Sequence, residues 1–486
     1  MYKDKACSHH NHCDQPQERL WPLVLLIFGC MTGAVAPAAV FAQTGLQEAK
    51  AAQPEGNEPA ANSSGAYTQP EDWNAKFQST YVWQHKAGMR SPYSGPFSLS
   101  GNPENAYTFT LTGAFGKRLW DGGEVYFDPE VSQGMPFSGN LTGMAGFYNG
   151  EITRASGPNP IVYRARLFVR QTWGLGGGQE AVASEANQLA GMVDKERVVL
   201  TAGFLPPLDI FEGNKYAHDP RTQFMSWCNM TSCAFDYAAD ARGYSWGVAL
   251  EYYTHDWVWR FGQFMQPRDP NQLPLDYQFF KHYGQNFEIE HAHELGGQPG
   301  KVRLLAYRNT ARTGSFADAM ASPDFAAGNA AGIPATGTVR KEAVKYGVGY
   351  NLEQAVTPDV GLFSRAMWQD GRYETYAFTE AHRSFALGTS LGGNLWARER
   401  DTIGVAYVRN AISGIYRQYL AAGGLGYFIG DGRLTYGDEQ IFEAYYSLGV
   451  IKSVWLTVDY QHLRNPAYNA DRGPVSIAGA RLHWEN

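Results

Sequence analysis

The sequence predicts an all-β fold, a transmembrane antiparallel β-barrel of about sixteen strands, preceded by a disordered N-terminal tail. First, many segments carry a large apolar residue at every second position, with small, polar or charged residues between. Second, no apolar run after residue 42 is long enough for a membrane-spanning helix. Third, the 486 residues include 54 Gly, 13 Trp, 29 Tyr and 26 Phe, a composition that suits alternating strands with aromatic girdles.

The first 42 residues predict a cleaved signal peptide. Basic residues precede the apolar stretch 21–29, and Val40-Phe41-Ala42 ends on the small residue that a signal peptidase requires. A lipid-modified Cys30 is the alternative. The bulky Phe28 and the apolar residues that continue past Cys30 favour cleavage after Ala42.

Residues 43–72 predict a flexible periplasmic linker. They are rich in Ala, Gln, Glu, Pro, Asn and Ser and contain almost no large apolar residues, so they cannot bury enough surface to fold alone. From residue 73 the pattern changes to alternation with a period of two. We therefore expect the barrel domain to span residues 73–486.

The alternation is clearest in five segments, at 107–115, 163–173, 243–253, 344–352 and 454–461. In each, apolar side chains share one face, and Thr, Gly or charged residues share the other. A soluble β-sandwich would also have one apolar face. Charged residues in mid-strand and the lack of helical patterns that could cover a sheet favour a barrel with a wet interior.

Turn and end signals agree with this fold. Gly-rich turns at 120–123, 296–300 and 370–372 are placed where hairpins require them. The segment 479–484 has the spacing of small, apolar and aromatic residues that is typical of the closing strand of outer-membrane barrels, although two residues follow its final Trp.

Two cysteines remain after residue 42, Cys228 and Cys233. In an exported chain they predict one disulfide that closes a small loop, and two free thiols are the alternative. Two thiolates without further ligands fall short of a four-coordinate metal site, so we expect neither a metal nor a cofactor. The formal net charge of −7 gives no reason to expect nucleic acid as a partner.

Arg164, Arg166 and Arg170 are the first candidates for lining a channel. Their spacing would place all three on one face of one strand. Facing lipid near the midplane, each would cost about 2–4 kcal/mol, so we expect them to face the lumen. There, planar guanidinium groups can bind adjacent hydroxyls in pairs. Alternatively, they pair with Asp or Glu across the lumen and hold the wall, and these two roles can coexist.

Several long motifs resemble the carbohydrate-selective porins of the OprB family. They include Phe168-Val-Arg-Gln-Thr-Trp-Gly, Tyr216-Ala-His-Asp-Pro-Arg-Thr-Gln-Phe-Met, Asp236-Tyr-Ala-Ala-Asp-Ala-Arg-Gly-Tyr, Glu439-Gln-Ile-Phe-Glu-Ala-Tyr-Tyr-Ser-Leu and Asn465-Pro-Ala-Tyr-Asn-Ala-Asp-Arg-Gly-Pro-Val. The resemblance covers roughly residues 73–486. It implies a sixteen-stranded barrel in the bacterial outer membrane that takes up monosaccharides passively, and it implies a monomer.

The connection 206–242 is the second candidate region, because it is too long for a tight hairpin. The resemblance suggests that it folds inward and narrows the channel, whereas an exposed extracellular loop is the alternative. Its candidate residues are Asp219, Arg221, Trp227, Asp236, Tyr237, Asp240 and Arg242.

These observations lead to the expected function, an outer-membrane porin through which glucose-like monosaccharides diffuse into the periplasm. A general or anion-preferring porin is the alternative, since arginines also attract phosphate and carboxylates. The expected partners are monosaccharides, outer-membrane lipid, lipopolysaccharide and the barrel-assembly machinery. We expect no enzyme activity. Gly243-Tyr-Ser-Trp-Gly247 matches a nucleophile elbow, but Ser245 lies in an alternating run with no helix after it.

Overall fold

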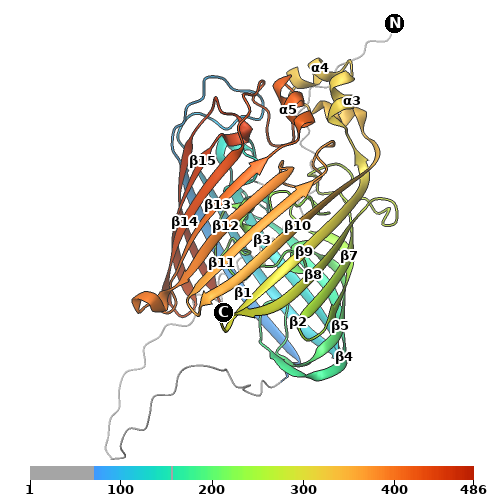
Figure 1. Ribbon diagram of the computed structural model, residues 1–486, viewed down its shortest axis with the longest axis vertical. Helices are drawn as coiled ribbons and strands as arrows, with labels where there is room; N and C mark the ends of the chain where they lie inside the picture. The colour runs from blue at the N-terminus through green and yellow to red at the C-terminus, as the bar shows by residue number, and fades with distance from the viewer. Residues whose placement is uncertain (1–69, 155–156) are drawn as a thin grey trace, which may run out of the picture. The chain divides into compact units, whose positions relative to one another are not determined.

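A computed structural model describes residues 70–154 and 157–486, in which sixteen antiparallel strands form one closed barrel (Figure 1). The predicted fold class and strand number are confirmed. The signal peptide expected at 1–42 lies outside the described residues, as does most of the linker expected at 43–72. No helix in the described residues is long and apolar enough to cross a membrane.

Each strand pairs with its neighbours in sequence. The first eight strands are β1 (Trp73–Lys86), β2 (Glu104–Trp120), β3 (Gly123–Met135), β4 (Ile161–Val182), β5 (Gly191–Leu205), β6 (Ser245–Tyr253), β7 (Trp257–Met265) and β8 (Tyr283–Leu295). The others are β9 (Gln298–Thr313), β10 (Lys341–Thr357), β11 (Val360–Gln369), β12 (Arg383–Gly392), β13 (Thr402–Ala411), β14 (Glu439–Ile451), β15 (Val454–Arg464) and β16 (Val475–Glu485). Pairing between β1 and β16, from Gln78–Glu485 to Lys86–Ile477, closes the ring.

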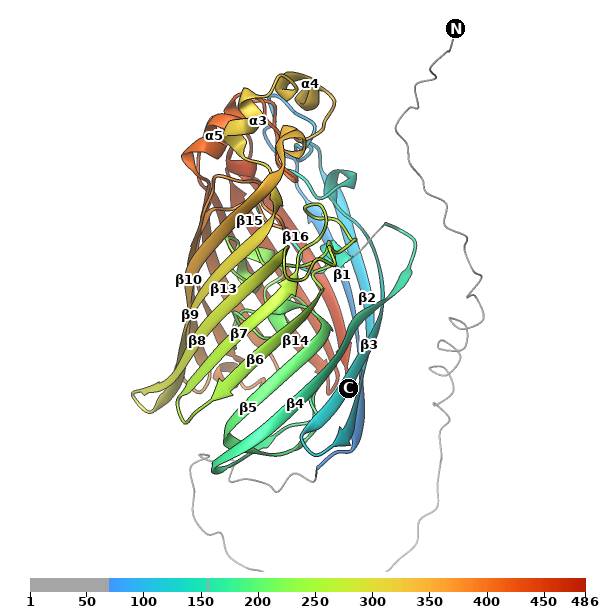
Figure 2. The same ribbon diagram turned by 90° about the vertical axis from the view of Figure 1, so that its right-hand side faces the viewer.

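Short helices lie in the connections. They are α2 (Trp227–Met230), α3 (Phe316–Ala321), α4 (Phe325–Ala330) and α5 (Gly414–Ala421). Helices α3, α4 and α5 lie at one end of the barrel, and the C-terminus lies at the other (Figures 1 and 2).

The alternation places polar side chains inside and apolar side chains outside. In β2, Thr108, Thr110 and Thr112 are buried toward the lumen, whereas Phe115 is exposed on the outer face. In β15, Asp459 is buried inside and Val458 is 57% exposed outside. An outer face of this kind requires apolar surroundings, as the lipid of a membrane would provide.

The two ends of the barrel differ in the length of their connections. Tight turns, such as Asp121–Gly122 and Gly296–Gly297, join strands at the end that carries the C-terminus. At the other end, strands are joined by long segments such as 206–244 and 412–438. In outer-membrane barrels the short turns face the periplasm and the long loops face outward. The turn expected at 370–372 instead begins one of the long connections, 370–382.

A β-bulge in β4 corrects one expectation. Asp128 of β3 pairs with Arg166, and Pro129 pairs with Arg164, so Ala165 has no partner. The extra residue reverses the side-chain phase at this point. Arg166 and Arg170 face the lumen, but Arg164 faces outward, where its guanidinium carbon lies 4.6 Å and 5.1 Å from the ring centres of Phe204 and Trp246.

Candidate functional site

The connection 206–244 folds into the lumen, where side chains from the inner faces of distant strands hold it. Glu443 of β14 accepts hydrogen bonds from the backbone N–H groups of Met225, at 2.6 Å, and Ser226, at 3.1 Å. Arg481 of β16 donates to the carbonyl oxygens of Pro220, at 2.8 Å, and Gln223, at 2.7 Å. These contacts exclude the alternative of an exposed loop.

Two further strands hold the same connection. Arg365 of β11 donates to the carbonyl oxygen of Asn229 at 2.6 Å. Lys345 of β10 forms an ion pair with Asp236 at 2.8 Å. Asp236 is completely buried, and it also accepts hydrogen bonds from the backbone N–H groups of Tyr376 and Ala377. Asp236 is therefore an anchor of the connection. It does not line the cavity that lies beside the connection.

A disulfide joins Cys228 and Cys233 within this connection. Both cysteines are fully buried, and Gly146 of the connection between β3 and β4 packs directly on them. A Cβ atom at Gly146 would lie 2.4 Å from the Cys228 sulfur and 2.7 Å from the Cys233 sulfur. The disulfide therefore fixes a tight turn against a second loop inside the barrel, at a position that only glycine can occupy without a shift.

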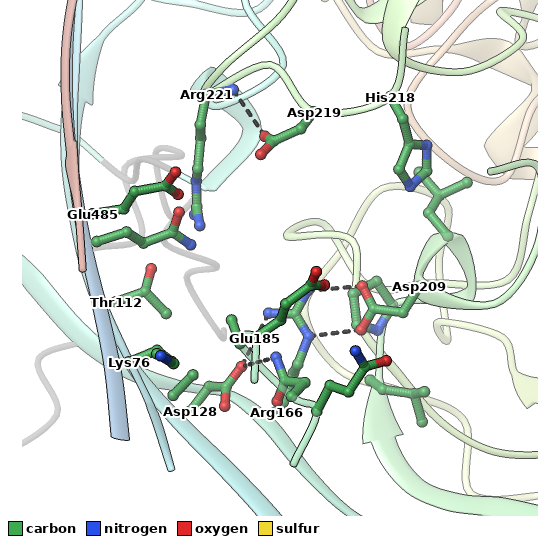
Figure 3. A pocket seen from close by; sticks show the side chains of 18 of the residues that line it. Lys76, Thr112, Asp128, Arg166, Glu185, Asp209, His218, Asp219, Arg221 and Glu485 are labelled. Atoms are coloured by element: carbon green, nitrogen blue, oxygen red, sulfur yellow. Dashed lines mark hydrogen bonds and ion pairs between the residues drawn. The ribbon is translucent and has the colours of Figure 1, made fainter. Parts of the chain in front are cut away.

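A cavity of about 930 Å³ lies beside this connection, on the inner faces of β1 to β5 and β16 (Figure 3). The structure brings most of the predicted residues to its wall, namely Arg166, Arg170, Asp219, Arg221, Trp227, Tyr237 and Arg242. Arg164, Asp236 and Asp240 are not in its lining. Sequence reasoning did not single out Lys76, Asp128 or Glu485, which also line it. Alternation in β1, β3 and β16 was the available signal for these three.

Two of the lining arginines are held by carboxylates. Arg166 lies between Asp128, at 3.2 Å, and Asp209, to which it donates two hydrogen bonds of 2.6 and 2.8 Å (Figure 3). Arg221 is buried and forms ion pairs of 2.8 Å with both Glu130 and Glu151. These two arginines hold the wall and the loop, which is one of the two roles considered for lining arginines.

Asp219 lies next to Arg221 in the connection. Its carboxylate accepts a hydrogen bond from the Arg221 backbone N–H at 2.9 Å (Figure 3). Burial alone would raise the pKa of Asp219, but the positive charge of Arg221 and this hydrogen bond outweigh burial and lower the pKa. Asp219 therefore presents a negative charge to the cavity.

Arg170 and Arg242 are placed over aromatic rings. Arg170 donates to the carbonyl oxygen of Asn187 at 2.9 Å, and its guanidinium lies 5.1 Å from the ring centre of Tyr126. The Arg242 guanidinium lies 4.6 Å from the ring centre of Tyr163. Stacking on a ring leaves the edge of a guanidinium able to donate hydrogen bonds to a ligand.

Aromatic faces complete the wall. Phe168, Trp227 and Tyr237 line the cavity, and the Trp227 ring is stacked on Phe378 with centroids 4.8 Å apart. Guanidinium and carboxylate groups bind adjacent hydroxyls, and aromatic rings pack on apolar C–H faces. The cavity therefore combines the groups that recognise a neutral, hydroxylated ring.

Asp240 lies behind the cavity wall and is not among the residues that line the cavity. Its carboxylate accepts hydrogen bonds from the backbone N–H groups of Arg242, at 2.9 Å, and Tyr244, at 3.2 Å. Burial raises the pKa of Asp240 to about 6, against the lowering effect of these hydrogen bonds and the Arg242 charge. Asp240 thus fixes the backbone that carries Arg242.

A charge network on strands β6 to β9, which includes the cavity-lining Glu251, was not predicted. Arg260 of β7 forms ion pairs of 2.9 Å with Glu251 and Glu288 and of 3.0 Å with Glu290. Arg303 of β9 also pairs with Glu290, at 2.7 Å. The signal was present as charged residues at alternate positions of apolar strands, but single-strand patterns do not reveal partners on neighbouring strands.

The comparisons with known proteins agree with this architecture. A family model described as carbohydrate-selective porin, OprB family, matches residues 114–485. No curated protein matches the chain. The high-pH structure of Pseudomonas putida OprB is 14% identical with a TM-score of 0.63, and the match covers 85% of this chain and 94% of that one. This likeness shows the fold.

Two other solved structures are more distant. The low-pH structure of the same Pseudomonas putida porin is 11% identical with a TM-score of 0.45, and the match covers 85% of this chain and 93% of that one. The outer-membrane channel DcaP of Acinetobacter baumannii is 10% identical with a TM-score of 0.47, and the match covers 87% of this chain and 99% of that one.

Proposed function

Because the chain belongs to the OprB family of carbohydrate-selective outer-membrane porins, which are not enzymes, we propose that it passes glucose-like monosaccharides into the periplasm by passive diffusion. The observation that carries the proposal is the cavity wall. Arg170 and Arg242 point stacked guanidinium groups to the same cavity as the aromatic rings of Phe168 and Trp227.

The proposed passage follows from these groups. A monosaccharide that enters the lumen loses water from its hydroxyls, and Arg170, Arg242 and Asp219 replace those hydrogen bonds. Its C–H face packs on an aromatic ring. Several weak contacts spread over a cavity of about 930 Å³ allow the sugar to leave as readily as it enters.

A general or anion-preferring porin is the second candidate, since four arginines line the cavity. The carboxylates that bind the lining arginines favour a neutral sugar over an anion as the solute. Asp128 and Asp209 bind Arg166, and Glu130 and Glu151 bind Arg221, so the positive charges of these two lining arginines are already compensated. A site for anions would leave those charges available to the ligand.

The remaining parts of the proposal concern export and assembly. Residues 1–42 act as a cleaved signal peptide, and residues 43–72 form a periplasmic linker before the barrel domain 73–486. The barrel-assembly machinery inserts the chain among outer-membrane lipid and lipopolysaccharide. The proposal includes a monomer as the working unit, and the pairing of β1 with β16 is compatible with it, since one chain supplies a complete ring.

Block of ion current by glucose in planar bilayers tests the proposed substrate. Glucose is expected to reduce the current of the purified chain. Arg170→Gln removes a charged donor from the cavity and is expected to weaken glucose block by about tenfold, as the loss of one charged hydrogen bond predicts.

Arg164→Gln is the matched control, since it removes the same charge from the outer face of the same strand. Glucose block should be unchanged in this variant. Strong anion selectivity without glucose block would support the anion-preferring porin instead. An equal loss of block in both variants would show that the assignment of Arg170 to the sugar pathway is wrong.

A further inference from the structure

The outward-facing arginines of the barrel gather at one end. Side-chain phase and exposure place six strand arginines on the outer face of the described strands, and all of them lie near the end with the long loops. They are Arg164, Arg308, Arg312, Arg383, Arg409 and Arg464. In the described strands, no outward-facing arginine lies near the short turns. Both ends of the barrel cross a membrane–water interface, so tolerance of charge at an interface does not explain this asymmetry.

Three of these arginines form a row across neighbouring strands. Arg383 is the first residue of β12, Arg409 lies two residues before the end of β13, and Arg464 is the last residue of β15. The register pairs Arg409 with Gln440 of β14, and Gln440 with Arg464. Strands lie about 4.8 Å apart, so Arg409 and Arg464 are separated by about 10 Å across the sheet.

The row keeps a positive charge. Arg409 pairs with Asp438 at 2.6 Å, and its side chain stays 60% exposed. Arg383 and Arg464 are exposed as well. Among the described residues, one acidic partner binds one of the three arginines, which leaves two positive charges on this part of the rim.

Apolar side chains lie directly below the row. Phe385 and Leu387 of β12, Phe442 of β14, and Val458 and Tyr460 of β15 are exposed on the same outer face. The arginines therefore lie at the edge of the lipid-facing band, at the level of the headgroups. Guanidinium groups bind phosphate oxygens in pairs, and neighbouring arginines can share one phosphate or bind two.

We propose that Arg383, Arg409 and Arg464 bind the phosphate groups of a phosphorylated glycolipid in the outer leaflet. This proposal rests on the proposed function in one respect, the orientation of the barrel in the membrane. The row reaches the outer leaflet only if the long loops face the cell exterior. The glycolipid's acyl chains would pack on the exposed apolar residues below the row. Gln440, between two of the arginines, supplies a further hydrogen-bond donor.

Binding of bisphosphorylated lipid A to the folded full chain in detergent tests the proposal. The variant Arg383→Gln/Arg409→Gln/Arg464→Gln is expected to lose at least about tenfold in affinity, given the contribution of each basic residue near anionic headgroups. The matched control, Arg90→Gln/Arg372→Gln/Arg433→Gln, removes three exposed arginines from loops at the same end. It should lose less than about twofold.

Glucose block measured on the same variants separates this proposal from the proposed function. Block should stay intact when the row is removed, because all three arginines are on the outer face. Unchanged lipid A affinity in the row variant, or an equal loss in the loop variant, would overturn the proposal. Equal affinity for phosphatidylglycerol, or complete displacement by inorganic phosphate, would also overturn it. If the triple variant does not fold, each single variant must show part of the loss.

Discussion

Single residues set the charge that a solute meets in the channel. Arg166 and Arg221 are each bound by two carboxylates, so they contribute more to the position of the wall than to its net charge. Arg170 and Arg242 are placed by aromatic rings and a backbone contact, and their charge faces the cavity. The four lining arginines therefore differ in how they are held, Arg166 and Arg221 by pairs of carboxylates and Arg170 and Arg242 over aromatic rings.

Asp240 gives a prediction about pH. Burial raises its pKa to about 6, from an ordinary value of 3.8. An acid with a raised pKa destabilises the folded state where it is charged, so this cost is present above pH 6 and is relieved as the pH falls through 6. In urea unfolding of the micelle-bound porin, Asp240→Asn should be more stable than the parent at pH 8. The difference should shrink between pH 7 and pH 4.

Asp240→Ala is the control for this measurement. It removes the charge and also the acceptor for the N–H groups of Arg242 and Tyr244, so it should be less stable than Asp240→Asn at every pH. A stability difference between Asp240→Asn and the parent that does not depend on pH would contradict the raised pKa.

For single residues, the sequence predicted the types of residue that line the lumen better than the direction in which each side chain points. It pointed to arginines of β4 and of the long connection, and seven predicted residues do reach the cavity. It could not reveal the bulge at Ala165, because the extra residue depends on pairing with Pro129 of β3 and leaves no mark in β4 itself. It also could not show that Asp236 and Asp240 lie behind the wall. Asp236 is bound by Lys345 of the distant β10, and Asp240 is turned toward the backbone N–H groups of its neighbours Arg242 and Tyr244.

The connection 206–244 is the element that gives the lumen its shape. Strands β10, β11, β14 and β16 contribute side chains that hold it, so no single contact decides its position. The sequence predicted the alternating strands well, since a period of two follows from the pleat itself. The inward path of the connection required the resemblance to a known family, because its anchors lie between 109 and 261 residues away in the sequence.

The disulfide gives a prediction for this element. Cys228→Ser/Cys233→Ser removes a closed loop whose constraint is worth about 2 kcal/mol in the chain-entropy model. The barrel strands do not depend on it, so the channel should still conduct. The freed connection is expected to raise open-channel current noise and to let disaccharides pass more readily relative to glucose. Single-channel recording and liposome swelling measure the two effects.

The parent porin treated with a reductant is the control, and it should approach the behaviour of the double variant. Noise and disaccharide permeation equal to those of the oxidised parent would mean that the contacts with Glu443, Arg481 and Arg365 suffice to hold the connection.

At the scale of the whole molecule, the end with long loops is expected to face the cell exterior. Ala326→Cys places a thiol on α4, and Lys452→Cys places one in the turn between β14 and β15, where both parent residues are exposed. A membrane-impermeant maleimide added to intact cells should label the first variant. The second should react only after the outer membrane is permeabilised. Labelling of the second variant in intact cells would reverse the orientation and remove the basis for the lipid site.

Because β1 pairs with β16, the barrel can close only when all of its strands from β1 to β16 are present. Nine residue pairs join Gln78–Lys86 to Ile477–Glu485, and without β16 both edge strands of the sheet would have unpaired N–H and C=O groups. A chain that lacks β16 would have two unpaired edge strands in place of the pairing between β1 and β16. Closure of the ring therefore also removes the free edges through which such a sheet could pair with other chains.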